Sequence, residues 1–411
     1  MSDLIHTHVC SNNMAVLGES MPWLESAALT IVLPAGCVWD PVDRLGLANL
    51  TCEMAERGAG SRDSRQFLEQ LELLGADWSS SVSAAHTSFG AAMPADRLSD
   101  VLPLFADLTR RPRLPEEQLE EARQSCLHEL HALEDDLAQR VMAALRRHFF
   151  PDPWGRLPEG DEAALQTATH GEVREFCQGH YRAGEAILGV AGKIHWTATL
   201  EQIESLWGDW DSGSSAPLVT TEPSYGYHHI EHDSAQTHIA VACSAVPFRD
   251  PDFYQARGAV GVLSDGMSSR LFTEVREKRG LCYTVSASCH TLRDRGAIFC
   301  YAGTTPDRAQ ETLDVVLAEL RRLNAGVQAD ELRRLKARIK SVLIMQQESS
   351  RARSGQIVGS WYHLGRVQSL DEVRQIIDGL TCDSINDYLT RHPLDDFTVV
   401  TLGPRPLEVN T

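Results

Sequence analysis

Residues 266–285 read GMSSRLFTEVREKRGLCYTV, and this stretch decides the fold of the chain. One of the two adjacent serines can accept a backbone hydrogen bond as a helix N-cap, and Gly280 supplies the left-handed residue that commonly ends a helix. Tyr283 then begins an alternating strand. The stretch therefore predicts a helix followed at once by a strand, with Arg276 near the negative end of the helix dipole.

The same order of elements occurs in the first half of the chain. A predicted helix over 64–74 ends at Gly75, and an alternating strand over 78–84 follows it. In both halves a second strand, a turn containing Pro, Asp and Arg, and two helices come next. The repetition, at an offset of roughly 205–213 residues, indicates a duplicated unit.

A segment rich in Ser, Gly, Pro and Thr lies between the two halves. It lacks an apolar period, which is typical of a linker. We therefore predict an N-terminal domain over 1–208, a linker over 209–227 and a C-terminal domain over 228–411. Because short turns join paired strands, each homologous domain is predicted to be α+β, with a mostly antiparallel or mixed sheet covered by helices.

The composition limits the class of protein. The 411 residues include 38 Lys and Arg and 57 Asp and Glu, giving a net charge of −19, which argues against nucleic acid or an anionic membrane as a partner. No apolar stretch approaches the roughly 20 residues that span a bilayer. Ten Cys occur without a C-x-x-C pair, and the start lacks the basic and apolar regions of a signal peptide. We therefore expect reduced thiols and a cytoplasmic location.

A second informative stretch, GLANLTCEM at 46–54, lies on a predicted helix over 45–56. Together with 266–285 it resembles the insulinase-like (pitrilysin-type) metallopeptidases, a family that includes mitochondrial processing peptidase. Active members read G-[LI]-A-H-x-x-E-H-M here, where the two His bind zinc and the Glu is the general base. The resemblance covers nearly the whole chain and implies the duplicated fold of that family.

The chain departs from the family motif at every chemical position. Asn49 replaces the first His, Cys52 replaces the Glu, and Glu53 replaces the second His. The usual spacing places the third family ligand at Glu129, and Ala122 occupies the place of a supporting glutamate. The resemblance thus implies a degenerate zinc motif, and we predict that this chain binds no catalytic zinc. The alternative is a rewired metal site built from the Cys and the two Glu.

The stretch at 266–285 matches a C-terminal-domain signature of the family, S-S-R-L-F-x-E-[LV]-R-E-K-x-G-L-x-Y. The resemblance implies that Arg276 and Tyr283 form the pair that reaches the zinc site of a partner domain. There a cation with several N–H donors and a phenolic O–H hold the substrate backbone and stabilise the developing oxyanion.

These features predict the accessory, zinc-less subunit of a heterodimeric peptidase. A homologous partner would carry H-x-x-E-H and the zinc, peptides would be the substrates, and this chain would be inactive alone. The first alternative is a non-enzymatic scaffold or peptide-binding protein that retains the fold, a use that family members in respiratory complexes illustrate. The second is peptidase activity of this chain alone through the altered site, which the missing ligands oppose.

Three possible metal ligands also alternate near the start of the chain. His6, His8 and Cys10 would lie on one face of a leading strand. Because no fourth ligand is in view, we interpret their spacing as coincidence.

Overall fold

The computed structural model describes residues 4–213 and 217–409, which form two compact units. Unit 1 comprises residues up to Ala132, Asp152–Thr221 and Met345–Ser369. Unit 2 comprises Leu133–Pro151, Glu222–Ile344 and the residues from Leu370 onward. Of the predicted linker 209–227, residues 214–216 lie outside the described residues.

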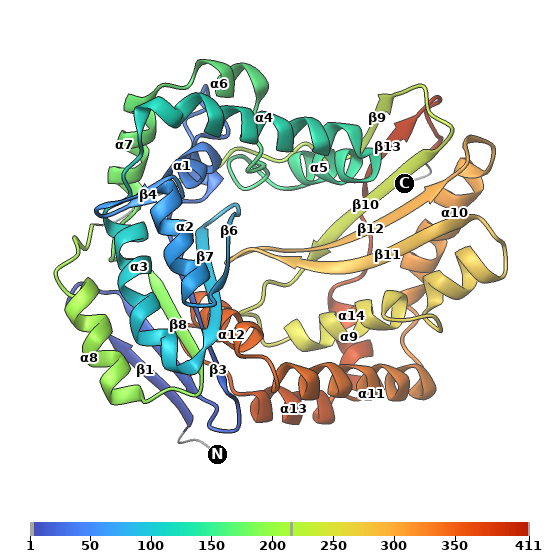
Figure 1. The fold of residues 1–411 in the computed structure, drawn as a ribbon. Coiled ribbons are helices and arrows are strands. Elements are labelled where there is room, and N and C mark those ends of the chain that lie inside the picture. Colours follow the sequence, from blue (N-terminus) through green and yellow to red (C-terminus); the bar gives the residue numbers. More distant parts are fainter. Residues whose placement is uncertain (1–3, 214–216, 410–411) are drawn as a thin grey trace. The chain divides into compact units, whose positions relative to one another are not determined.

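Unit 1 contains a six-stranded mixed sheet in the order β1-β2-β8-β3-β7-β6 (Figure 1). Only β2 and β8 pair in parallel, and the other neighbours are antiparallel. The strands are β1 (Ile5–Val9), β2 (Ala15–Ser20), β3 (Ser26–Leu33), β6 (Asp77–Val82), β7 (Thr87–Pro94) and β8 (Ile187–Gly192). A two-stranded ribbon, β4 (Gly58–Ala59) with β5 (Arg62–Asp63), lies outside this sheet.

Helices surround the sheet of unit 1. Those from the first half of the sequence are α1 (Leu47–Ala55), α2 (Ser64–Leu73), α3 (Leu98–Arg110), α4 (Leu119–Asp135), α6 (Glu162–Thr167), α7 (His170–His180) and α8 (Trp196–Trp207). Single 3₁₀ turns are η2 (Cys37–Trp39), η3 (Ala95–Arg97) and η4 (Glu116–Gln118). One further helix, α12 (Ser350–Leu364), comes from the second half of the sequence.

Unit 2 contains a five-stranded mixed sheet in the order β11-β12-β10-β13-β9. The strands are β9 (Tyr227–Glu231), β10 (Thr237–Ala245), β11 (Cys282–Thr291), β12 (Gly296–Thr304) and β13 (Thr398–Gly403). The helical elements are α5 (Leu137–Phe149), α9 (Phe253–Ser264), η5 (Phe272–Glu277), η6 (Pro306–Arg308), α10 (Ala309–Leu323), α11 (Ala329–Gln346), α13 (Leu370–Gly379) and α14 (Cys382–Arg391). Only β13 and β9 pair in parallel.

The two sheets have the same topology, which confirms the predicted α+β fold with a duplicated unit. The five strands β2-β8-β3-β7-β6 correspond in order, direction and sequence position to β9-β13-β10-β12-β11. The predicted strand over 78–84 is β6 and its counterpart is β11, so the helix-then-strand stretches lie at equivalent places. Unit 1 adds β1 at one edge.

The units differ from the predicted division at 209–227 because each takes one helix from the other half of the sequence. Helix α12 lies on β2, β3 and β8 of unit 1, and α5 lies on β10 and β13 of unit 2. In Figure 1, α12 is the orange-red helix beside the blue and green strands. An amphipathic helix pattern shows that an apolar stripe must be covered but not which sheet covers it, so sequence periodicity could not reveal this arrangement.

Helix α12 packs closely on its sheet. Ile357 and Val358 join a buried cluster whose sheet members are Ala15, Leu17, Val32 and Ile187. A side chain at Gly189 of β8 would meet Val358 Cγ2 at 2.6 Å, so a glycine is required where the helix approaches the strand. Arg353 is fully buried, and its Nε and Nη2 bind Glu19 Oε2 at 2.9 and 2.6 Å.

No helix in the described ranges 4–213 and 217–409 is both long enough and apolar enough to cross a membrane.

Candidate functional site

The helix of the degenerate motif, α1, is fixed at its start by a buried carboxylate. Asp40 accepts hydrogen bonds from Gly46 N and Ala48 N, both at 2.8 Å, and so caps the helix from six residues upstream. Gly46 has a φ of 98°, a left-handed conformation that favours glycine. Burial raises the pKa of Asp40 to about 7, although the two N–H groups oppose this shift. The cap positions the following turn, which carries Asn49 and Cys52.

Asn49 and Glu129 lie together in unit 1, as the family spacing predicts. The Asn49 carboxamide donates to Glu129 Oε2 at 2.9 Å and approaches Cys126 Sγ at 3.7 Å. An amide N–H₂ is a donor, whereas a metal ion requires a lone pair. The Asn49 amide therefore donates a hydrogen bond to the Glu129 carboxylate at the place where the family binds zinc.

Cys52 is buried in unit 1 beside the carboxyl group of Glu56. Its side chain is buried, and Sγ is 4.0 Å from Glu56 Oε1. Burial raises the pKa of the Cys52 thiol well above its usual value, and the neighbouring Glu56 carboxyl raises it further. A metal ligand or a base would have to be the thiolate, so this environment opposes both roles.

Glu53 takes part in an ion-pair network. Its Oε2 is 3.5 Å from Arg57 Nη2, and Nη1 of the same guanidinium is 3.5 Å from Glu121 Oε2. Burial raises the pKa of Glu53, and the nearby charge of Glu129 adds to this effect, while Arg57 opposes it. Among the described residues, Cys52, Glu53 and Glu129 do not converge as a metal-binding group.

Sequence reasoning missed Glu56, which follows α1 directly and lies one helical turn after Cys52. Its carboxylate accepts a short hydrogen bond from Ser80 Oγ on β6. Burial raises the pKa of Glu56 to about 7, although the Ser80 hydrogen bond lowers it. The sequence did indicate that Glu56 lies near Cys52, because residues four apart share one face of a helix.

We expect Glu56→Gln to stabilise unit 1 at pH 8 and to have little effect at pH 4. The pKa of Glu56 is higher in the folded chain than in the unfolded chain, so the protonated carboxyl favours folding. This contribution to the free energy of unfolding is lost as the pH rises from about 4.5 to 7. Gln keeps the acceptor for Ser80 without the charge, and the expected gain is about 2 kcal/mol. All eight Trp lie in unit 1, so urea unfolding followed by tryptophan fluorescence measures it. An equal effect at both pH values would contradict the prediction.

In unit 2, Arg276 lies on an irregular helical turn. Residues Phe272–Glu277 form a π-helix, a rare conformation that is common at functional sites. The guanidinium lies over the Phe272 ring at 4.8 Å from its centroid. The side chain is exposed and, within the part of the chain that the structure describes, makes no ion pair. Its cation is therefore available to a ligand.

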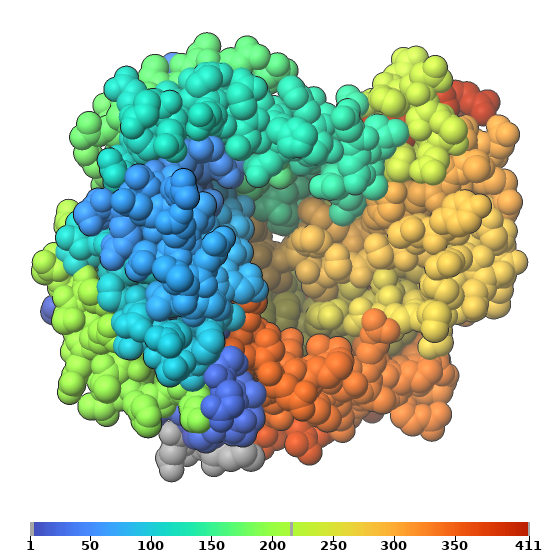
Figure 2. All heavy atoms as spheres, viewed as in Figure 1, coloured from blue at the N-terminus to red at the C-terminus, as the bar shows by residue number. Residues whose placement is uncertain are grey.

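Tyr283 lies at a second irregularity. The register of β11 with β12 shifts between Cys282 and Thr284, so Tyr283 is the extra residue of a β-bulge. Bulges re-aim side chains and are frequent beside active sites. The Tyr283 side chain is 86% exposed, which is unusual for an aromatic residue in a strand. Figure 2 shows residues of this region, coloured yellow to gold, at the surface of unit 2.

The connection between these two residues is short and is closed by backbone hydrogen bonds. Gly280 N donates to Arg276 O at 3.0 Å, and Leu281 N donates to Val275 O at 3.0 Å. Gly280 has a φ of 58°, as its predicted role at the helix end requires. Arg276 also lies close enough to Cys282 to lower the pKa of that thiol, although burial raises it by more.

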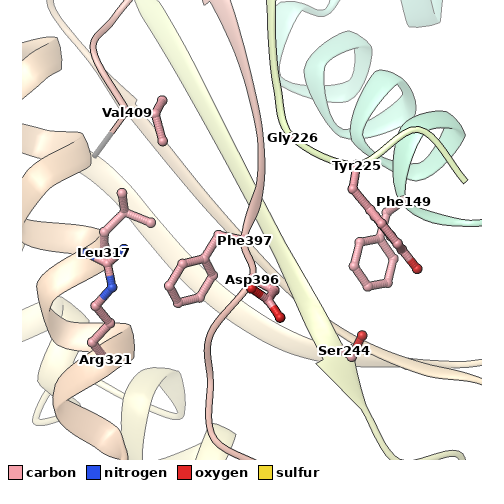
Figure 3. A pocket seen from close by; sticks show the side chains of 9 residues that line it. All are labelled: Phe149, Tyr225, Gly226, Ser244, Leu317, Arg321, Asp396, Phe397 and Val409. Carbon is pink, nitrogen blue, oxygen red and sulfur yellow. The ribbon is translucent and has the colours of Figure 1, made fainter. Parts of the chain in front are cut away.

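Unit 2 also contains a cavity of about 440 Å³ (Figure 3). Phe149 and Tyr225 lie on one side of it, and Leu317 and Arg321 of α10 lie on the other. The remaining lining residues are Gly226, Ser244, Asp396, Phe397 and Val409. Its size and its mixture of aromatic and polar side chains are typical of pockets for small ligands or single side chains.

The fold and these sites define a duplicated α+β protein that presents an exposed Arg and Tyr in one unit. A family model described as Insulinase (Peptidase family M16) matches residues 15–156. A model described as Peptidase M16 inactive domain matches residues 167–339. The chain belongs to this insulinase-like M16 peptidase family, which confirms the family predicted from the two sequence stretches.

Relatives of similar length support this assignment. An uncharacterized zinc protease of Rickettsia felis is 24% identical over 398 residues, covering 96% of this chain and 97% of its own. An uncharacterized zinc protease of Bacillus subtilis is 21% identical over 407 residues, covering 98% of both chains.

Solved structures share the fold. A peptidase M16 inactive domain from Pseudomonas fluorescens superposes with a TM-score of 0.89 at 22% identity, covering 98% of this chain and 99% of that one. A chain in a structure of Complex III2 from Candida albicans superposes with a TM-score of 0.83 at 16% identity, covering 97% and 96%.

Proposed function

We propose that this chain is the zinc-less accessory subunit of a heterodimeric insulinase-family peptidase, and that it supplies Arg276 and Tyr283 to a partner's zinc site. The observation that carries the proposal is a contrast between the two units. Arg276 and Tyr283 are exposed on a π-turn and a β-bulge. In contrast, Asn49 and Glu53 of α1 already have partners, Glu129 of α4 and Arg57 respectively. Within the described residues, Arg276 makes no ion pair and Tyr283 is 86% exposed, so both side chains are accessible to a ligand.

The geometry of unit 2 supports peptide binding beside Tyr283. Strand β11 is at the edge of its sheet and pairs only with β12 among the described strands. An extended peptide can add to such an edge through main-chain hydrogen bonds. Tyr283, at the start of this edge, would donate its phenolic O–H, and Arg276 would supply a cation where negative charge develops on the scissile carbonyl.

We further propose that α1 holds no catalytic zinc in this chain. Asn49 donates to Glu129, Arg57 pairs with Glu53, and burial keeps the Cys52 thiol protonated, so the residues present do not fit the ion. Peptide-bond hydrolysis would therefore take place at the zinc of the H-x-x-E-H partner. Ten free cysteines agree with a cytoplasmic, reducing location for the pair.

We expect the metal content of the purified chain to be the same in the wild type and in Glu129→Ala. Glu129 is the one family ligand retained in type, so a rewired site would lose zinc in this variant. Inductively coupled plasma mass spectrometry of both proteins makes the comparison. Zinc that is stoichiometric in the wild type and absent from Glu129→Ala would show that the site is rewired.

Native co-purification followed by mass spectrometry tests the accessory role. A companion of similar size, near-stoichiometric and containing H-x-x-E-H, is expected. The reconstituted pair should cleave unfolded peptides that neither chain cleaves alone. A homodimer with no companion, or a companion without the zinc motif, would refute the accessory role.

The alternative is a scaffold or peptide-binding protein without catalysis. The cavity in unit 2 favours it, because a pocket of this size can hold a peptide side chain. The likeness to a chain in the structure of Complex III2 shows that the two chains share a fold. Peptide binding that is unaffected by Arg276→Ala but weakened by Phe149→Ala would favour this alternative.

A further inference from the structure

Three side chains of different chemical types converge in unit 1, apart from α1. His8 is on β1, Cys10 follows the end of that strand, and Glu204 is on α8. One donor atom from each lies within 4.8 Å of the other two. His8 Nε2 and Glu204 Oε1 are 2.9 Å apart. Within the described residues this is the one group of three or more such ligands that could hold a metal ion.

The separations are 2.9 Å for His8 and Glu204 and at most 4.8 Å for the other pairs, and these two values lie on either side of those in a tetrahedral metal site. Zinc bonds of about 2.3 Å to sulfur and about 2.0–2.2 Å to nitrogen and oxygen place neighbouring donors about 3.3–3.6 Å apart. A donor pair separated by 4.8 Å, the upper limit in this cluster, would have to close by about 1.2–1.5 Å to bind one ion. The His8 and Glu204 side chains are 36% and 46% exposed, so an ion could enter from solvent, and water could complete the coordination.

The local structure fixes the spacing between the strand and the helix. Cys10 N donates to Met14 O, and Asn13 N donates to Cys10 O, both at 2.9 Å, which closes the turn after β1. Asn12 Nδ2 then donates to Trp207 O at 2.8 Å and to Trp210 O at 3.2 Å. These bonds join the turn to the end of α8, one helical turn beyond Glu204. The ligands are therefore held in place by neighbours that are not ligands themselves.

The third residue of the cluster is Glu204 and not His6, which alternates with His8 and Cys10 in the sequence. His6 stacks on Trp196 with ring centroids 5.0 Å apart, and its Nε2 is 3.4 Å from Ser20 Oγ. It is thus held outside the cluster, and Glu204, which is 194 positions from Cys10, takes its place. Of the three alternating residues, His8 and Cys10 therefore belong to this cluster and His6 does not.

We propose that His8, Cys10 and Glu204 bind a divalent transition metal ion, with Zn²⁺ as the best match to one nitrogen, one sulfur and one carboxylate oxygen. The ion would link the β1–β2 turn to α8 and so stabilise their contact. Binding would release the thiol proton, because only the thiolate is a metal ligand. Burial and the Glu204 charge raise the pKa of the Cys10 thiol, so the ion must displace a tightly held proton. This inference is independent of the proposed accessory role.

Cobalt titration of the metal-free, untagged full-length chain tests the site. Co²⁺ reports thiolate ligation through a charge-transfer band in the near ultraviolet, and added Zn²⁺ should abolish the band by displacement. We expect one equivalent of Co²⁺ to bind with this band in the wild type. The band should be lost in Cys10→Ser, and Glu204→Gln should weaken binding at least tenfold.

Two control variants separate this site from α1. Cys52→Ser and Glu129→Ala should bind Co²⁺ as the wild type does. Glu204 is half exposed, so Glu204→Gln should fold normally, and its circular dichroism spectrum verifies this. No charge-transfer band at saturating Co²⁺ would overturn the proposal. A band that persists in Cys10→Ser and disappears in Cys52→Ser would instead assign the metal to α1.

Discussion

Arg276→Ala in the assembled pair is expected to lower kcat/KM for peptide cleavage by about 10²–10³-fold. Removing a single preorganised donor to a developing oxyanion has this effect in other hydrolases. The exposed guanidinium of Arg276 makes no ion pair among the described residues, so its loss should leave the fold of unit 2 unchanged. Tyr283→Phe should retain the aromatic surface and lose only the phenolic O–H, with a smaller decrease.

Arg279→Ala is the matched control for this experiment. Arg279 is three residues away and exposed, but its Nη1 is paired with Glu274 Oε2 at 2.8 Å. Turnover by the Arg279→Ala pair should stay within about twofold of the wild type, because surface ion pairs contribute little. Size-exclusion chromatography must show that each variant still assembles. Wild-type turnover in both Arg276→Ala and Tyr283→Phe would exclude the proposed role of the pair.

Arg353→Ala is expected to lower the free energy of unfolding of unit 1 by about 3–5 kcal/mol. The Arg353 side chain has no exposed surface and binds Glu19, whose side chain is only 13% exposed. The substitution would leave the Glu19 carboxylate buried without its partner, which is far more costly than losing the pair as a whole. Urea unfolding followed by tryptophan fluorescence measures the effect, since every Trp lies in unit 1.

Arg351 on the same helix provides the control. Its guanidinium pairs with Asp77 at 2.7 Å, but the two side chains are 42% and 84% exposed. Arg351→Ala should therefore cost about 1 kcal/mol or less. Adding Glu19→Gln to Arg353→Ala should recover part of the loss, because the unpaired charge is then gone. Equal destabilisation by Arg351→Ala and Arg353→Ala would show that burial of the Arg353–Glu19 pair is not the cause.

The fold could be predicted from sequence to the level of elements and duplication. The helix stop at Gly280, the alternating strand after it and the matching elements near Gly75 are local patterns, and local patterns fix local structure. The destinations of α5 and α12 could not be predicted, because their apolar stripes carry no information about which sheet they cover. The division into 1–208 and 228–411 therefore describes the sequence repeat rather than the compact units.

Residues of the candidate sites could be predicted where a fixed sequence separation, within one helix or in the family motif, relates them. Family spacing placed Glu129 beside Asn49, and the structure brings the two within hydrogen-bonding distance. The π-turn under Arg276 and the bulge at Tyr283 depend on pairing with β12 and on packing, which a single stretch does not specify. The position of Glu204 beside His8 and Cys10 could not be predicted either, because only the tertiary fold brings α8 to β1.

The origin of α12 has a consequence for synthesis on the ribosome. The strands of the unit 1 sheet are complete once Gly192 has been translated, but the helix that covers Leu17, Val32 and Ile187 begins only at Ser350. During translation of the intervening residues, the apolar face of these strands therefore lacks the helix that covers it in the folded chain. Such a surface favours aggregation or chaperone binding. A chain that terminates early, before α12, should for this reason be insoluble, although it contains every strand of its sheet.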